Sequence, residues 1–316
     1  MELFKIVLIV LIVVISKPVL ACDVCGCRVN NEGIPTEQGF SVGAFEQYTT
    51  FGTLQFEGHE VENVGAQFMN SSVTQFIVGY QIDDEWAVQF NLPFIERSFR
   101  RPRGFEVDEG SISGLGDSTL MGTCRAFEFH EEECAFDWNI VGGIKFPTGS
   151  SHRIKEELDE VEVEGAPKSG IHGHDLALGS GSFDGVIGTS VFGQCDRFFG
   201  TAAMQYAIRT RGTIGYRYAN DMTWNGGPGV YVWKEEEGTL GLQCNVSGES
   251  KGVDNLQGVP ALDTASTNVY LGPELTFLWE KHLNVEVGVD LPVIQKNSAF
   301  QIVPDIRVHG GVNWRF

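Results

Sequence analysis

The stretch "IRVHGGVNWRF", residues 306–316, ends the chain and decides its fold class. One alternate set of its residues is apolar or glycine and comprises Ile306, Val308, Gly310, Val312, Trp314 and Phe316. The other set is mostly polar and comprises Arg307, His309, Gly311, Asn313 and Arg315. A period of two is that of a β-strand, because successive side chains point to opposite faces. The stretch therefore predicts a strand with one apolar and one polar face.

Two environments could receive the apolar face of such a strand. A soluble sandwich would bury it against a second sheet, whereas a transmembrane barrel would turn it toward lipid and keep the polar face in the lumen. The chain has 316 residues, with 39 Gly and 22 Phe. Closed barrels commonly reach this length. The sequence has a single long apolar run, so a helical membrane protein is excluded.

That apolar run marks the start of the chain as an export signal. Ile6–Ile15 contains ten consecutive Ile, Val or Leu residues, and a short stretch that ends in the small residue Ala21 follows it. Ten residues cover only about half of a bilayer core. We expect residues 1–21 to be a removed signal peptide, with an uncleaved anchor as the alternative. Residues 22–37 would then form a periplasmic segment and residues 38–316 a membrane domain.

Turn signals divide the remaining chain into twelve strand-like segments. They lie near residues 39–51, 72–82, 85–95, 115–128, 134–147, 176–193, 197–210, 222–234, 238–248, 267–280, 283–294 and 305–316. Tight hairpins alternate with longer connections, which lie near 52–71, 96–114, 148–175, 211–221, 249–266 and 295–304. Outer-membrane barrels place tight turns in the periplasm and long loops outside. The pattern predicts an all-β, transmembrane antiparallel barrel of about twelve strands in the outer membrane.

Charged side chains on the polar faces are expected to line the lumen, because charges face lipid only at a large cost. Twelve strands enclose an interior between that of filled eight-stranded barrels and open sixteen-stranded porins, so we expect a narrow or plugged pore. The lining candidates are Asp117, Arg125, Asp137, Lys145, Arg209, Arg211, Glu274, Glu286, Asp290, Arg307 and Arg315. They could pair with one another and stiffen the lumen, or select solutes by charge.

The last strand must close the sheet against the first, since no backbone edge can meet hydrocarbon. Trp314 and Phe316 would then lie in the periplasmic girdle of aromatic residues. They resemble the C-terminal aromatic signature of bacterial outer-membrane barrels, which the insertion machinery reads. That machinery and the outer-membrane lipids are therefore expected partners.

Three motifs in the middle of the chain carry a resemblance to a known family. They are "GLGDSTL" at 114–120, "GIKFPTGSS" at 143–151 and "LGSGSFDGVIGTSVF" at 178–192. Their order and spacing resemble the outer-membrane channels named for the meta-cleavage pathway of phenol degradation. The resemblance implies a transporter for small, apolar or aromatic molecules. The alternative is a non-conducting accessory barrel linked to metal handling.

An enzyme is not expected. Twelve-stranded outer-membrane phospholipases use Ser, His and Asn, and "HGHDLALGSGS" at 172–182 supplies His172, His174, Ser180 and Ser182. A triad requires Ser and His within hydrogen-bond reach. Because no nucleophile motif frames these residues, an outer-membrane lipase is the weakest of the three functions.

The chain is acidic, with 42 Asp and Glu against 22 Lys and Arg and a net charge of −20. This charge argues against nucleic acid as a partner. The basic cluster "ERSFRRPRG" at 96–104 is expected to be a solvated loop, with binding of anionic solutes or lipopolysaccharide phosphates as the alternative. The acidic run "EELDEVEVEG" at 156–165, near two histidines, is either a mobile loop or a divalent-cation site.

Seven cysteines are an odd number for an oxidising compartment. A disulfide between Cys124 and Cys134 is possible, because a hairpin centred near Phe129 would place them opposite each other. A turn centred near Glu131 would leave them staggered.

Three further cysteines, Cys22, Cys25 and Cys27, form "CDVCGC" directly after the predicted signal. Two of them could form a disulfide, and Cys22 could be lipidated. Alternatively the thiols could bind Cu(I) or Zn as a soft-ligand cluster.

Overall fold

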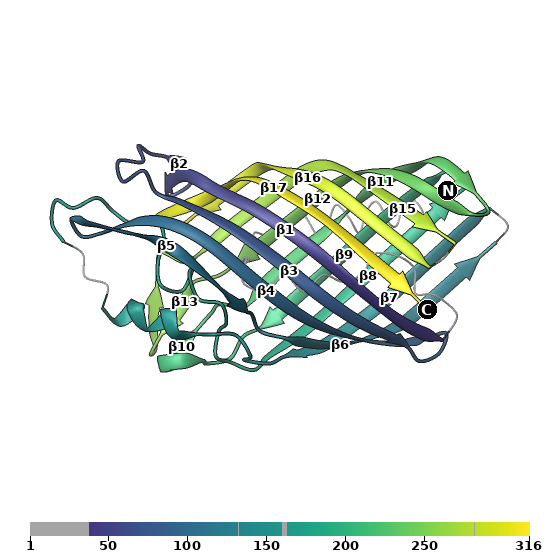
Figure 1. Cartoon of the computed structure of the whole chain (residues 1–316), viewed down its shortest axis with the longest axis horizontal. Helices are drawn as coiled ribbons and strands as arrows, with labels where there is room; N and C mark the ends of the chain where they lie inside the picture. Colours follow the sequence, from purple (N-terminus) through teal and green to yellow (C-terminus); the bar gives the residue numbers. More distant parts are fainter. Residues whose placement is uncertain (1–37, 132, 160–162, 281) are drawn as a thin grey trace.

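The computed structural model describes residues 38–131, 133–159, 163–280 and 282–316. In these residues twelve long strands form a closed antiparallel barrel, seen from the side in Figure 1. The strands are β1 (Gly39–Phe56), β3 (Phe68–Gln81), β4 (Trp86–Arg103), β6 (Thr119–His130), β7 (Cys134–Lys145), β8 (Asp184–Cys195), β9 (Phe198–Ile208), β11 (Asp221–Glu235), β12 (Gly238–Lys251), β15 (Ser266–Trp279), β16 (Leu283–Asn297) and β17 (Phe300–Arg315). The predicted fold class is confirmed. The predicted signal peptide and periplasmic segment lie outside the described residues.

The last barrel strand closes against the first, as the terminal stretch predicted. β17 pairs with β1 from Ser41–Arg315 to Phe56–Phe300. The backbone N–H of Phe316 adds a hydrogen bond of 2.9 Å to the carbonyl oxygen of Phe40. Closure removes the two exposed edges that an open sheet of these strands would carry into hydrocarbon.

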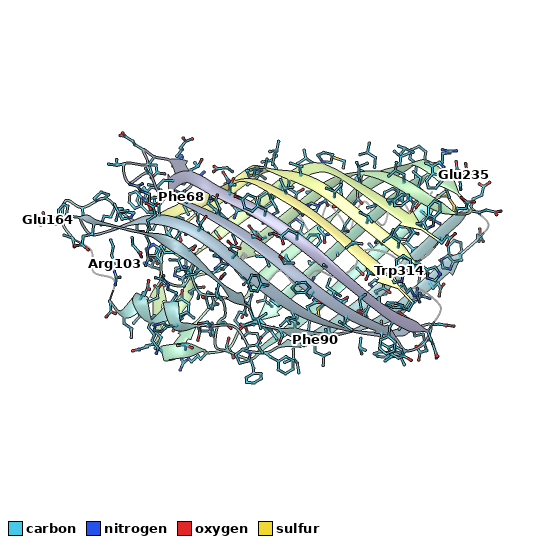
Figure 2. The ribbon with its side chains drawn as sticks, in the orientation of Figure 1. Phe68, Phe90, Arg103, Glu164, Glu235 and Trp314 are labelled. Carbon is cyan, nitrogen blue, oxygen red and sulfur yellow. A yellow bond between two sulfur atoms is a disulfide. The ribbon has the colours of Figure 1, made fainter. Side chains whose placement is uncertain are left out.

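The two faces of the strands differ in polarity. Exposed apolar side chains on the outer face include Phe76, Phe90, Leu120, Ile140, Ile187, Leu242, Leu271, Val287 and Val308. Buried polar side chains on the inner face include Gln75, Asn91, Asn139, Lys145, Asn245, Asp290 and His309. An apolar exterior around a polar interior is the pattern of a transmembrane barrel. Figure 2 shows Phe90 projecting from the outer surface, with Glu164 and Glu235 at opposite ends.

A carboxylate on the outer parity of β1 is satisfied locally. Glu46 accepts hydrogen bonds from the hydroxyl groups of Ser72, at 2.5 Å, and of Thr74. Both hydroxyls come from the neighbouring strand β3, and their hydrogen bonds stabilise the carboxylate of Glu46 on the outer face.

The long connections gather at one end of the barrel. The long connections carry β2 (His59–Glu60), β5 (Glu106–Leu115), η1 (His152–Leu158) and η2 (Thr213–Gly215), and a small sheet of β10 (Tyr216–Arg217), β13 (Asp254–Leu256) and β14 (Val259–Ala261). They form the left end of Figure 1. We call this end extracellular and the other end periplasmic, because outer-membrane barrels place their long loops outside. No helix among the described residues is long and apolar enough to cross a membrane.

The predicted segments differ most from the structure in three places. The segment at 96–114 is not a loop, since β4 continues to Arg103 and pairs with β5 from Phe94–Leu115 to Arg103–Glu106. The strand predicted at 176–193 begins at Asp184. The connection predicted at 295–304 is a two-residue turn, because β16 and β17 extend to Asn297 and Phe300.

The pairing between β16 and β17 covers only part of the two strands. Their pairing runs from Leu283–Trp314 to Asp290–Arg307 and goes no further toward the extracellular end. Beyond it, Nε2 of Gln295 donates to the carbonyl oxygen of Pro304, at 2.5 Å. Prolines in both strands contribute to the interruption, because they lack the N–H that a ladder needs.

Candidate functional site

The connection between β7 and β8 folds back into the extracellular end of the barrel. We refer to its residues 170–182 as the inward segment. Ile171 and Leu176 are fully buried there, in a cluster with Phe51, Met69 and Phe99 of the wall. These contacts explain the mistaken strand prediction, because a buried apolar run has the same composition in a packed loop as in a strand. The inward segment fills part of the extracellular half of the lumen.

Two arginines of β4 hold the inward segment. Nη1 of Arg97 donates to the carbonyl oxygens of Asp175, at 2.5 Å, and of Ala177, at 3.0 Å. Nη1 of Arg101 donates to the carbonyl oxygen of Ile171, at 3.4 Å. The prediction of a solvated loop at 96–104 is therefore wrong. Because the strand continues, Arg97 and Arg101 face inward, while Arg100 between them faces outward.

A charged histidine anchors the middle of the inward segment. Nδ1 of His174 lies 3.0 Å from Oε1 of Glu157, and its Nε2 lies 3.2 Å from Oδ1 of Asp175. Burial by itself would lower the pKa of His174, but the carboxylates of Asp175 and Glu157 outweigh it and hold that pKa well above its ordinary value. The ring also stacks on His172, with centroids 5.7 Å apart. The hydroxyl of Tyr218 donates to the carbonyl oxygen of His174, at 2.9 Å.

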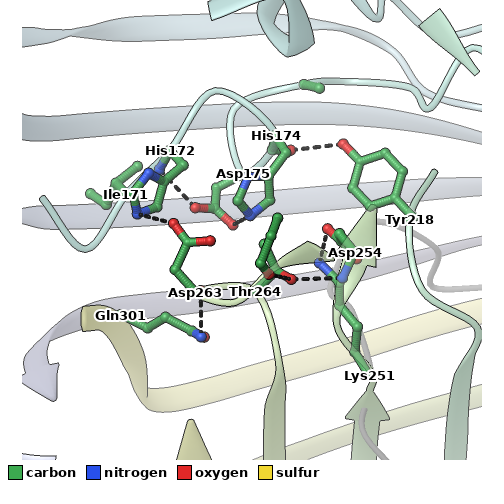
Figure 3. Close-up of polar contacts among 12 residues, drawn as sticks. Ile171, His172, His174, Asp175, Tyr218, Lys251, Asp254, Asp263, Thr264 and Gln301 are labelled. Atoms are coloured by element: carbon green, nitrogen blue, oxygen red, sulfur yellow. Dashed lines mark hydrogen bonds and ion pairs between the residues drawn. The ribbon is translucent and has the colours of Figure 1, made fainter. Parts of the chain in front are cut away.

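A pocket lies between the inward segment and strands β12, β15 and β17. Its apolar side is formed by Phe51, Met69, Ile302 and Val303, and its polar side includes Arg97, His174, Asp175, Lys251, Asp263 and Gln301. Figure 3 shows the polar side, where Nε2 of His172 lies 3.4 Å from Oδ2 of Asp263. Nε2 of Gln301 donates to the backbone carbonyl of Asp263, at 2.6 Å. The site therefore offers apolar contact next to hydrogen-bonding groups.

Several predicted lumen residues meet in one chain of ion pairs along the inner wall. Nζ of Lys145 contacts Asp117 and lies 2.9 Å from Oδ2 of Asp184. Nη1 of Arg209 lies 3.1 Å from the same oxygen, and its Nε donates to Asp221, at 2.9 Å. This series of ion pairs runs from Asp117, just before β6, to Asp221 at the start of β11. Asp184 and Asp221 were not singled out from the sequence, because the predicted strand at 176–193 placed Asp184 in its interior and the predicted connection at 211–221 included Asp221.

A second group of charges lies on β12, β15, β16 and β17. Nη2 of Arg307 lies 3.1 Å from Oε2 of Glu249. Nε2 of His309 lies 3.2 Å from Oε2 of Glu274, and its Nδ1 lies 3.6 Å from Oδ2 of Asp290. These side chains are buried, so their ion pairs are shielded from solvent.

The remaining lumen candidates are placed differently. Arg125 and Asp137 are buried at the periplasmic end, with Nε of Arg125 3.7 Å from Oδ1 of Asp137. Glu286 and Arg315 are half-buried on the inner face. Arg211 is exposed in the connection after β9 and does not join the wall.

The cysteine pairing differs from the prediction. Cys134 forms a disulfide with Cys195, which stands opposite it across β7 and β8. Cys124 pairs in register with Ile140 and is a free thiol, as is Cys244. His130 pairs with Ala135 next to the turn and a bulge follows Arg125, so Cys124 cannot face Cys134. Cys22, Cys25 and Cys27 lie outside the described residues.

The serines considered for a lipase belong to the ion-pair chain. The hydroxyl of Ser180 donates to Oδ2 of Asp117, at 2.8 Å, and that of Ser182 donates to Oδ1 of Asp184, at 2.9 Å. These hydrogen bonds hold the end of the inward segment on the wall. They do not orient either serine toward a histidine.

The structure resembles solved outer-membrane proteins. An outer membrane channel from Pseudomonas putida F1 matches with a TM-score of 0.60 and 13% identity, over 92% of this chain and 99% of that chain. The beta domain of the Bordetella autotransporter BrkA matches with a TM-score of 0.45 and 10% identity, over 88% and 99% of the two chains. The monoaromatic hydrocarbon channel CymD matches with a TM-score of 0.40 and 9% identity, over 89% of each chain.

The sequence itself gives no such match. No model of a protein family matches it, and no curated protein matches it. At 13% identity the likeness to the Pseudomonas putida channel shows the fold alone. The chain and that channel share a barrel architecture over nearly their whole lengths.

Proposed function

We propose that the protein is an outer-membrane channel that passes small apolar or aromatic molecules. The observation that carries the proposal is the inward segment, which narrows a polar lumen and is held by side-chain hydrogen bonds from Arg97 and Arg101. These bonds join the segment to the wall through side chains rather than through strand pairing. A segment held in this way can control passage.

The pocket beside the inward segment supports the class of solute. Met69, Ile302 and Val303 provide apolar contact, and Gln301 and Asp263 provide hydrogen-bonding groups in the same pocket. Small-molecule sites commonly combine an apolar lining with a few polar groups that fix orientation. The resemblance to the meta-pathway channels implies the same class of molecule.

The charges of the inner wall support uncharged solutes. Lys145 forms an ion pair of 2.9 Å with Asp184, and Arg307 forms one of 3.1 Å with Glu249. Paired charges of this kind stiffen the wall and leave few unpaired groups to attract an ion. The apolar exterior supports residence in the outer membrane, with export and assembly by the insertion machinery as parts of the same proposal.

Transport by the full-length protein tests the proposal. The refolded barrel is placed in planar bilayers for conductance, and in liposomes for uptake of a neutral aromatic such as toluene and of a neutral sugar of similar mass. We expect the protein to raise the rate of toluene entry above that of protein-free liposomes. The factor by which it raises this rate should be larger than the factor for the sugar. Conductance and toluene uptake equal to those of bare lipid would overturn the channel function.

A further inference from the structure

Three potential metal ligands meet at the periplasmic rim of the lumen. Glu128 and His130 lie near the end of β6, and Asp137 lies near the start of β7. One ligand atom from each lies within 4.8 Å of the other two. Nδ1 of His130 and Oε1 of Glu128 are 2.7 Å apart.

The backbone places these side chains on one face. A bulge between Arg125 and Phe127 shifts the parity of β6, so that Arg125, Glu128 and His130 all face inward. Glu128 pairs directly with Asp137 across the hairpin. Two carboxylates in direct cross-strand register repel each other. The cluster therefore requires a compensating positive charge.

The positive charge of Arg125 compensates the carboxylates of Glu128 and Asp137 only in part. Nη1 of Arg125 lies 2.5 Å from Oε2 of Glu128, but its Nε lies 3.7 Å from Oδ1 of Asp137. Asp137 is only 4% exposed. Among the described residues, its Oδ1 accepts no hydrogen bond. This buried oxygen faces the cluster and is available to a cation.

We propose that Glu128, His130 and Asp137 bind a divalent transition-metal ion, with Zn²⁺ as the ion of best fit. One imidazole nitrogen and two carboxylate oxygens are a three-ligand set to which Zn²⁺ adds water. An imidazole ligand disfavours Ca²⁺ and Mg²⁺, which take oxygen ligands. Arg125 binds the second oxygen of Glu128 and thereby orients the first toward the metal.

The site is accessible and needs little rearrangement. The side chains of His130 and Glu128 are 51% and 32% exposed, so an ion can enter from the periplasmic end. Ligand atoms around tetrahedral Zn²⁺ are roughly 3.5 Å apart, which rotation of the exposed imidazole can achieve. The proposal concerns binding and does not depend on whether the barrel conducts.

Zn²⁺ binding to the full-length barrel tests this site. The titration uses a protein in which Cys22, Cys25 and Cys27 are replaced by Ser, because those thiols would bind Zn²⁺ themselves. The refolded protein in detergent is titrated with Zn²⁺ in a calorimeter. We expect one equivalent to bind, and His130→Ala and Asp137→Asn each to weaken binding more than about tenfold.

The matched control is His59→Ala, which removes an exposed histidine from β2 at the opposite end of the barrel. It is expected to bind Zn²⁺ as the parent does. Heat-modifiable migration on gels verifies that each variant is folded. Absence of saturable binding in the parent, or equal affinity in the parent and both site variants, would overturn the site.

Discussion

Nη1 of Arg97 lies 3.0 Å from the carbonyl oxygen of Ala177, so a strand of the barrel wall is joined directly to the segment inside the lumen. Arg97 is 1% exposed, and the same Nη1 also serves the carbonyl of Asp175. A buried carbonyl that loses its donor costs about 1–3 kcal/mol. The position of the inward segment therefore depends in part on this guanidinium.

The Arg97→Met variant is expected to loosen the inward segment while leaving the barrel closed. Methionine keeps much of the apolar volume and removes the donors to Asp175 and Ala177. We expect a several-fold higher single-channel conductance in planar bilayers. Arg103→Met, at the exposed end of the same strand, is the control and should conduct as the parent does. Equal conductance in all three proteins would contradict a closing role for the segment.

The ion pairs that fix the inward segment should weaken as the pH rises. Burial lowers the pKa of His174, but Asp175 and Glu157 raise it further, so the pKa lies above its ordinary value. The charged ring therefore stabilises the inward segment fully below about pH 6.5, and this stabilisation is lost as the pH rises through the raised pKa. The pKa values of Asp175 and Glu157 are lowered by His174 against burial, so their contributions are lost in acid. The ion pairs of His174 with Asp175 and Glu157 therefore stabilise the inward segment most between roughly pH 4.5 and 6.5.

Hydrogen exchange checks this pH dependence. Protection of a peptide that covers residues 170–182, corrected for intrinsic exchange rates, is expected to fall above about pH 6.5. A peptide from β12 serves as the internal reference. In His174→Gln the dependence above that pH should disappear, because the titrating group is gone. Protection that stays constant to pH 10 in the parent would contradict the role of His174.

The sequence predicted the barrel because lipid constrains every second residue of a strand. Val285, Val287 and Val289 of β16 had to be apolar, and their neighbours Glu286 and Asp290 had to face away from lipid. Strand number and closure followed from this alternation. Above the membrane the constraint ends, and β4 was predicted to end too early for that reason.

Bulges and packed loops account for the other errors. The bulge after Arg125 changes parity by one residue without any mark in the sequence, so the misalignment of Cys124 with Cys134 and the meeting of Glu128 with Asp137 could not be derived. The inward segment was missed because its apolar residues pack against a wall that is assembled from distant strands. Arg97 was visible as part of a basic cluster, but its partners are backbone carbonyls, which carry no sequence signal.

Opposite faces of β15 should respond differently to the same charge. Leu275 is 43% exposed on the outer face, and Thr276 faces inward, in register with Glu286. An arginine on the lipid face costs up to about 2–4 kcal/mol, so Leu275→Arg should lower the yield of folded protein in membranes. Thr276→Arg should be tolerated, because its guanidinium can reach Glu286. Equal yields in heat-modifiability gels would contradict the assigned faces.

The terminal aromatic residue is expected to act in assembly beyond its place in the girdle. Phe316 is 69% exposed, and Phe198, at the same rim beside a short turn, is 70% exposed, so alanine at either position removes a similar contact with the membrane interface. If the insertion machinery reads the last residue, Phe316→Ala should lower the folded protein in the outer membrane several-fold more than Phe198→Ala. Quantitative blots of outer-membrane and periplasmic fractions measure the difference. Equal losses in the two variants would mean that Phe316 contributes only to the girdle.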